Sequence, residues 1–261
     1  LLDFFDESRP EIGLSEMSRI SGLDKATTHR VLVSLARHGW LEQHPKTRAY
    51  RLGVGLIKLA RIREATFPVQ AVVQPLLASL THRTHETSHL SFLTGSTLST
   101  VGVAESSQLN RVVIQPGLRL PLHATASGIA LLAASSNALV EQLLPADLAM
   151  HPSPAPPTRA QIQHQIELTR ERGYATADQT FEAEVYGIAV VLWGPDARPN
   201  GAIAVATPIS RMDENRCESI ACELQASANE ITQALGGRAP VGRATETRAP
   251  DAQPHHSPQA T

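Results

Sequence analysis

The chain has few of the residues that build disulfide scaffolds or metal sites. Only two of its 261 residues are cysteine, Cys217 and Cys222. On one expected helix these positions point about 140° apart, so a disulfide between them is not expected, and no metal-ligand spacing surrounds them. Such low cysteine use is typical of a reducing compartment. We therefore expect no metal, no cofactor and no crosslinked core.

Long hydrophobic runs are also lacking. No apolar stretch reaches the roughly 18 residues of a membrane-spanning helix, and the first residues do not have the pattern of a signal peptide. We therefore expect a cytoplasmic protein that has no membrane partner. The chain starts at Leu1 inside an apolar helix, expected over residues 1–6, so we expect that further residues precede it.

The net charge of −2 is small, but the charge is unevenly distributed. Residues 14–63 contain ten Lys or Arg and three Asp or Glu, a net of +7, which leaves −9 for the remainder. This asymmetry is typical of a basic nucleic-acid-binding module joined to an acidic partner domain. A length of 261 residues with 42% hydrophobic residues is enough for two domains with real cores.

Residues 14–52 carry the most informative pattern, LSEMSRISGLDKATTHRVLVSLARHGWLEQHPKTRAYRL. Apolar residues share one face of a helix over residues 14–21, and Gly22 would end that helix. Asp24 stands where the N-cap of a second helix belongs, and Gly39 is a plausible stop. Two short helices joined by a tight turn are the layout of a helix-turn-helix.

The second helix has two different faces. At 100° per residue, Val31 and other apolar residues gather on one side, together with Thr28, which we expect to pack in the core. On the other side Arg30 is the best candidate for a bidentate contact to guanine, or for a phosphate contact. Thr27 and Ser34 lie beside it.

A strand pair follows the second helix. Residues 40–43 and 49–52 alternate apolar and polar, and HPKTR turns between them, as in a wing that lies along a phosphate backbone. The candidate DNA-binding residues are Lys25, Thr27, His29, Arg30, Ser34, Lys46 and Arg48. Two alternatives remain open: a plain helical hairpin with a solvated basic face, and a winged module that binds RNA or a protein without an effector.

The remaining sequence predicts a second domain. Strands are predicted near residues 88–93, 98–104, 111–115, 174–177, 186–193 and 201–207, and helices near 123–133, 137–144, 158–172 and 213–235. This pattern indicates an α+β sensor domain with a mostly antiparallel sheet. The expected organisation is a winged helix-turn-helix over 1–53, linker helices over 54–83, the sensor domain over 84–237 with a Pro-rich loop at 151–157, and a disordered tail over 238–261.

Further motifs occur in a fixed order after the winged helix: LPLHATASGIALLA at 120–133, RGYATADQTFEAEVYGIAVVL at 172–192 and GAIAVATPISR at 201–211. With them, nearly the whole chain resembles the IclR family of bacterial transcription regulators. The resemblance implies a GAF-like effector-binding domain, a homodimer or dimer of dimers on operator DNA, and control by a small organic acid or related metabolite. It does not separate a repressor from an activator.

The resemblance also implies an effector pocket between a helix start and the sheet. Its expected lining is Ala126, Ser127, Gly128, Asp178, Gly187, Ile188, Ala204 and Ala206. Backbone N–H groups at such a helix start can hold a carboxylate. Relatives that bind very small polar acids often carry Ser or Cys at the positions of Gly187, Ala204 and Ala206. We therefore predict a larger or more apolar effector, such as an aromatic acid.

Three further positions depart from the family pattern. Ile129 stands at a usual Lys, Thr180 at a usual Glu and Glu184 at a usual Gly.

An enzymatic function is the least favoured hypothesis. His123 and Ser127 would lie one turn apart on the expected helix, but no nucleophile-elbow sequence surrounds Ser127. We therefore expect no catalytic residues.

Overall fold

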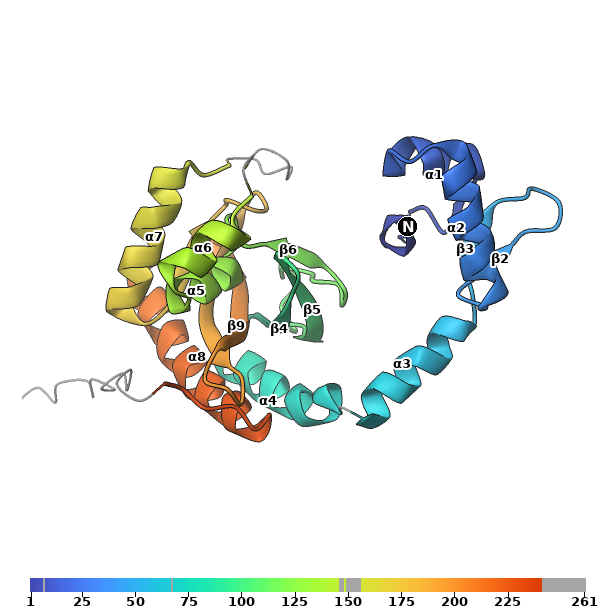
Figure 1. The fold of residues 1–261 in the computed structure, drawn as a ribbon. Coiled ribbons are helices and arrows are strands. Elements are labelled where there is room, and N and C mark those ends of the chain that lie inside the picture. Colours follow the sequence, from blue (N-terminus) through green and yellow to red (C-terminus); the bar gives the residue numbers. More distant parts are fainter. Residues whose placement is uncertain (7, 67, 146–147, 149–155, 241–261) are drawn as a thin grey trace, which may run out of the picture. The chain divides into compact units, whose positions relative to one another are not determined.

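The computed structural model describes residues 1–261 except 7, 67, 146–147, 149–155 and 241–261 (Figure 1). The chain divides into two compact units, Leu1–Val69 and Gln70–Thr261. Most of the Pro-rich segment and nearly all of the expected disordered tail lie outside the described residues, so both expectations stay predictions. None of the helices that are described is long and apolar enough to cross a membrane.

The first unit is a winged helix-turn-helix. Its elements are η1 (Leu2–Phe4), β1 (Glu11–Ile12), α1 (Leu14–Ser21), α2 (Lys25–Arg37), β2 (Leu41–Gln43), β3 (Tyr50–Leu52) and α3 (Gly55–Thr66). The strands are antiparallel in the order β1-β3-β2. Gly22 ends α1 in the left-handed conformation, with φ of 69°. The core consists of Ile12, Met17, Leu32, Leu41 and Tyr50.

The start of the chain differs from the sequence prediction. A helix was expected over residues 1–6, but only the 3-10 turn η1 forms. Asp6 explains where the turn stops, because its carboxylate Oδ1 accepts hydrogen bonds from the N–H groups of Ser8 (2.9 Å) and Arg9 (2.8 Å). Such a local side-chain bond competes with helix formation. Strand β1, which the sequence did not reveal, follows.

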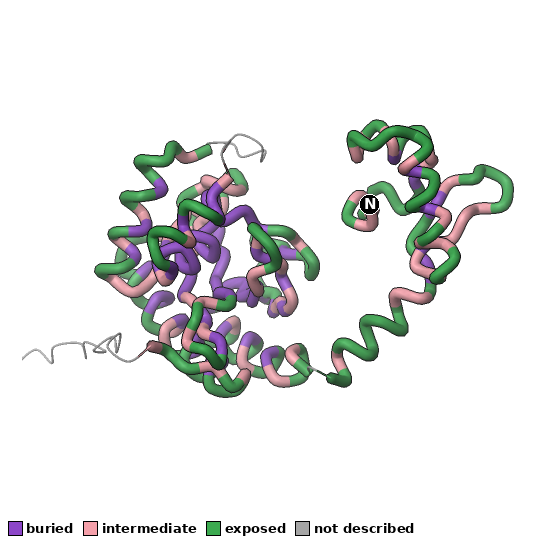
Figure 2. The backbone as a smooth tube through the Cα atoms, in the orientation of Figure 1, coloured by how far each residue is buried: buried purple, intermediate pink, exposed green. Residues whose placement is uncertain are grey.

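The second unit is an α+β domain with a six-stranded antiparallel sheet in the order β6-β5-β4-β9-β8-β7. Its strands are β4 (Thr87–Thr94), β5 (Thr97–Ala104), β6 (Arg119–Pro121), β7 (Ala175–Asp178), β8 (Val185–Trp193) and β9 (Pro199–Pro208). Its helices are α4 (Val69–Thr84), α5 (Ala126–Ala134), α6 (Asn137–Leu143), α7 (Arg159–Arg172), η3 (Ile209–Arg211) and α8 (Glu214–Ala234). The central strands β4 and β9 are largely buried (Figure 2).

Helices pack on both faces of this sheet. Helix α5 is buried along almost its whole length, and it packs with Ala189 and Ala204 in one core cluster. Helix α8 packs on β8 and β9. Helix α4, expected in the linker, lies against the sheet, since Ser88 on β4 donates a hydrogen bond to the carbonyl of Leu77 (3.0 Å).

Two predictions for the second unit are wrong. The strand expected at 111–115 does not form: this segment is held by side chains, and the Val112 carbonyl accepts a hydrogen bond from the Thr87 hydroxyl (2.7 Å). The helix expected from His123 starts only at Ala126. Thr125 is its N-cap, and its hydroxyl accepts a hydrogen bond from the N–H of Gly128 (3.1 Å).

Candidate functional site

Helix α2 is fixed in orientation by its N-terminus and its buried face. The Asp24 carboxylate accepts a hydrogen bond from the Thr27 N–H (2.9 Å), and this bond lowers the pKa of Asp24. Thr28 is fully buried, as its place on the apolar side of the helix predicted, and its hydroxyl donates a hydrogen bond to the Asp24 carbonyl (2.9 Å). Val31 was expected on the buried side, but it lies at the margin of the core with 36% of its surface exposed.

The opposite face of α2 is open to solvent. Lys25, His29, Arg30 and Ser34 are exposed, and Thr27 is half-buried beside them. The Arg30 guanidinium donates a hydrogen bond to the Thr27 hydroxyl (3.1 Å), which holds it over the first turns of the helix. The predicted residues of α2 therefore share one accessible surface.

The wing presents its two predicted basic residues at its tip. Lys46 and Arg48 are exposed, and the turn is held by the His44 ring, whose Nδ1 accepts hydrogen bonds from the N–H groups of Lys46 (3.2 Å) and Thr47 (3.1 Å). Within the described residues, no carboxylate pairs with either basic side chain. Both can therefore neutralise phosphate without first breaking an ion pair.

A cavity lies between α5 and the sheet of the second unit, with a volume of about 70 Å³. It is lined by His89, Val112, Val113, Ile114, Leu118, Leu120, Thr125, Ala126, Ser127, Ala177, Thr180, Phe181, Glu182, Val185, Gly187, Ala204 and Ala206. Most of these side chains are apolar. The start of α5 borders the cavity, and a helix N-terminus favours an anionic group.

Five predicted effector residues border this cavity: Ala126, Ser127, Gly187, Ala204 and Ala206. They come from α5, β8 and β9. Gly187 pairs with Ala206 and Ala189 with Ala204 across the two strands, so these positions share one face of the sheet. Small side chains there leave the space that the cavity occupies.

The three other predicted effector residues lie elsewhere. Ile188 is fully buried and, by strand alternation, faces the opposite side of β8. Gly128 packs on backbone: a Cβ added there would lie 2.3 Å from the Cα of Leu122. Asp178 is exposed at the end of β7 and lines an adjoining hollow, together with His123 and Ile129, and this hollow shares two lining residues with the cavity.

Sequence reasoning missed His89, the one histidine among the residues that line the cavity. It lies on β4 and is only 6% exposed, and its Nδ1 atom is buried without a hydrogen-bond partner in the described structure. Burial lowers the pKa of His89 from 6.5 to about 4, so the imidazole is neutral near pH 7. The alternation of polar and apolar residues in THETSHLSFL predicted a strand there, but not which face met a cavity.

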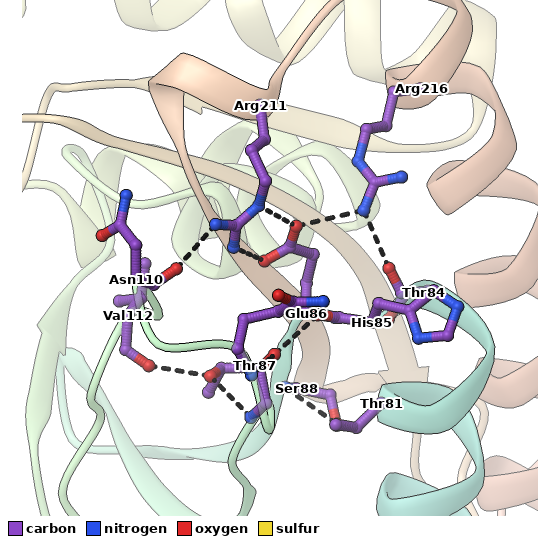
Figure 3. A network of polar contacts seen from close by, with 12 residues as sticks. Thr81, Thr84, His85, Glu86, Thr87, Ser88, Asn110, Val112, Arg211 and Arg216 are labelled. Carbon is purple, nitrogen blue, oxygen red and sulfur yellow. Dashed lines mark hydrogen bonds and ion pairs between the residues drawn. The ribbon is translucent and has the colours of Figure 1, made fainter.

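An ion-pair network around the buried Glu86 carboxylate supports the segment that carries Val112 and Ile114 (Figure 3). Glu86 is 1% exposed, and its carboxylate accepts two hydrogen bonds from Arg211 (2.8 and 2.6 Å) and one from Arg216 (3.0 Å). The same Arg211 donates to the Asn110 carbonyl (2.6 Å).

The network also reaches helix α4 at its last residue. Arg216 donates to the carbonyl of Thr84 (3.0 Å), and Thr84 is the last residue of α4. The cavity segment is therefore connected through Arg211, Glu86 and Arg216 to the helix that joins the two units.

The structure also shows the backbone at Glu184 and the positions of His123 and Ser127. Glu184, at a usual glycine of the family, has a φ of 64°, the left-handed conformation that favours glycine. The proposed pairing of His123 and Ser127 on one helix is wrong, because His123 precedes the N-cap of α5. One helical turn therefore does not hold them together as a nucleophile and a base.

Known proteins give an independent comparison. The model for the IclR helix-turn-helix domain matches residues 1–45, and the model for the bacterial transcriptional regulator IclR C-terminal domain matches residues 65–233. The HTH-type transcriptional regulator XynR of Escherichia coli (strain K12) is 31% identical over 245 residues, which cover 90% of this chain and 94% of that protein.

Solved structures agree with this comparison. An IclR transcriptional regulator from Silicibacter has a TM-score of 0.82 and 38% identity, over 92% of this chain and 95% of that one. An IclR homologue from Microbacterium hydrocarbonoxydans, solved with 4-hydroxybenzoate, has a TM-score of 0.70 at 24% identity, over 90% and 95% of the two chains. These matches span both units, and the chain belongs to the IclR family of bacterial transcriptional regulators, with a helix-turn-helix and a C-terminal ligand-binding domain.

Proposed function

We propose that α2 and the wing bind operator DNA, and that an organic acid in the cavity beside α5 controls that binding. The main support for this proposal is that each unit has the surface or cavity that one of the two roles requires. One presents an unpaired basic tip beside an exposed helix face, and the other encloses an apolar cavity at a helix N-terminus.

The lining supports an acid with an apolar body. Ala204 and Ala206 offer no hydroxyl group, whereas Thr125, Ser127 and His89 are polar. An engineered cavity of about 150 Å³ binds benzene. The cavity here is about 70 Å³, so an aromatic acid requires outward movement of the lining, which the segment carrying Val112 could supply.

A thermal-shift screen tests the effector class. We expect aromatic acids such as benzoate and 4-hydroxybenzoate to raise the unfolding temperature of the protein, since a ligand that binds only the folded state stabilises it. Stabilisation by two- and three-carbon acids alone would show that the effector is smaller and more polar than proposed.

We also propose that the chain acts as a dimer or a dimer of dimers. Val54, Ile57, Leu59 and Ile62 on or beside α3 are all more than 40% exposed. Such a concentration of exposed apolar side chains is typical of an interface. A two-fold dimer would place two α2 helices on half-sites of a palindromic operator.

Binding assays with point variants test the DNA surface. Arg30→Ala should lose preference for the operator over random DNA, because a base contact carries sequence information. Lys46→Ala should weaken binding to both DNAs alike and reduce the slope of log K against log salt by about one.

The matched control is Arg198→Ala, which removes the same charge from an exposed site in the other unit. It should leave both DNA affinities unchanged. Equal losses on operator and random DNA for Arg30→Ala would count against its role in base reading. A stronger competition by RNA than by duplex DNA would favour the alternative of an RNA-binding module.

A further inference from the structure

His89 is a buried polar group that the protein leaves without a partner at a cavity wall. On β4 the side chains alternate: the Ser88 hydroxyl points to the Leu77 carbonyl on α4, so His89 points to the other face, where α5 and the cavity lie. A buried polar atom without a partner is destabilising, because it has lost its hydrogen bonds to water. A ligand that forms a hydrogen bond with the imidazole would recover that loss.

The cavity has no permanent cation. Neither Lys nor Arg occurs among the described residues that line it. The lining from α5 is neutral, as are Gly187 of β8 and Ala204 and Ala206 of β9. Besides His89, the titratable group in the lining is Glu182, which is exposed and carries the charge of the wrong sign. Apart from the N-terminus of α5, an entering carboxylate therefore meets no positive charge in the lining unless one is created there.

We propose that the His89 imidazole receives the acid group of the effector, and that binding takes up one proton from solvent. This inference rests on the proposed function, because it names the residue that selects an acid. The effector arrives as a carboxylate and the free imidazole is neutral. A solvent proton adds to the imidazole, and the imidazolium donates a hydrogen bond to the carboxylate, so the filled cavity gains no net charge.

This mechanism sets both the specificity and the pH dependence of the cavity. A buried carboxylate raises the pKa of an adjacent imidazole, so protonation of His89 accompanies binding. An amide of the same shape gains no such pairing and should bind at least about tenfold more weakly. Above about pH 5, the affinity for the acid should fall about tenfold per pH unit until the bound imidazole itself loses its proton.

Calorimetry on the full chain tests the proposal with benzoate, 4-hydroxybenzoate and phenylacetate, each beside its amide. Titrations at pH 7 in phosphate and in Tris give the proton uptake, because the two buffers differ in ionisation enthalpy. We expect uptake of about one proton for the acids. His89→Gln should lose this uptake and bind at least about tenfold more weakly. The matched control is His164→Gln on α7, an exposed histidine outside the cavity lining, which should change neither.

The outcomes separate the inference from the proposed function. Acid binding to the wild-type protein without proton uptake would overturn the inference and leave the proposed effector class intact. So would unchanged uptake in His89→Gln, or equal affinity for acid and amide. If none of the acids binds the wild-type protein, the proposed effector class fails and the role of His89 fails with it. The proton count is read on the wild-type protein, so the test does not depend on how well the variant folds.

Discussion

His89 links the acidity of the solvent to the stability of the second unit. Its pKa is about 4 in the folded protein against an ordinary value of 6.5, because burial disfavours the charged imidazole. Between these values the unfolded chain binds the proton and the folded chain does not, so stability falls as the pH falls from 6.5 to about 4. The full effect of this shift is roughly 3 kcal/mol. Above pH 6.5 it is absent.

Unfolding in urea from pH 7.5 to 4.5 measures this effect. His89→Gln should lose less stability over this range than the wild-type protein, whereas His164→Gln should follow the wild-type profile. Parallel curves for the wild-type protein and His89→Gln would mean that the imidazole is already protonated or solvated in the folded state.

At the scale of elements, the close packing of α5 depends on Gly128. A Cβ at this position would meet backbone atoms of Leu122 at 2.3 Å, and backbone cannot move aside as a flexible side chain can. We expect Gly128→Ala to lower the free energy of unfolding by about 1–3 kcal/mol, measured by urea denaturation, despite the better helix propensity of alanine. An unchanged or higher stability would show that α5 and the preceding turn can separate at little cost.

At the scale of the whole molecule, the Glu86 network is the proposed connection between the cavity and α4. Effector binding and DNA binding must affect each other by the same factor if they are linked. Arg211→Gln removes the bonds to Glu86 and Asn110, while Arg216 still neutralises the buried carboxylate. This variant should retain binding of the acid and of DNA separately, but the factor by which the acid changes DNA affinity should shrink.

Fluorescence anisotropy with labelled operator, with and without saturating acid, measures that factor. Arg159→Gln is a suitable control, since Arg159 forms an exposed ion pair with Glu141 on α6, away from the network. An unchanged factor in Arg211→Gln would mean that the linkage between the two sites takes another route.

The sequence was sufficient for the elements whose signals are local. Gly22, Asp24 and Thr28 specified the turn, the cap and the buried face of the helix-turn-helix, because each acts within a few residues of its own position. The exposure of Arg30 and of the residues beside it on α2 was predicted from helical periodicity alone. The family motifs likewise indicated where small residues open α5.

The tertiary structure decided what depends on contacts between distant segments. Residues 111–115 have the composition of a strand, but they pair with no strand, and the Val112 carbonyl accepts a hydrogen bond from the side chain of Thr87, 25 positions earlier. Asp178 follows a motif that implied an effector contact, yet at the end of β7 it lines the adjoining hollow and not the cavity itself.

His89 shows most clearly the difference between what local sequence determines and what distant contacts determine. Its sequence neighbours determine that it lies on a strand, and therefore that it alternates with Ser88. Whether Ser88 or His89 points into the cavity depends on the pairing of β4 with β5 and β9 and on where α5 packs. The strand partners of His89, Val103 and Ala204, both lie more than ten positions away in the sequence. Local chemistry thus determined the DNA-binding module from the sequence, whereas the polar residues of the cavity were brought together only by packing of the sheet against α5.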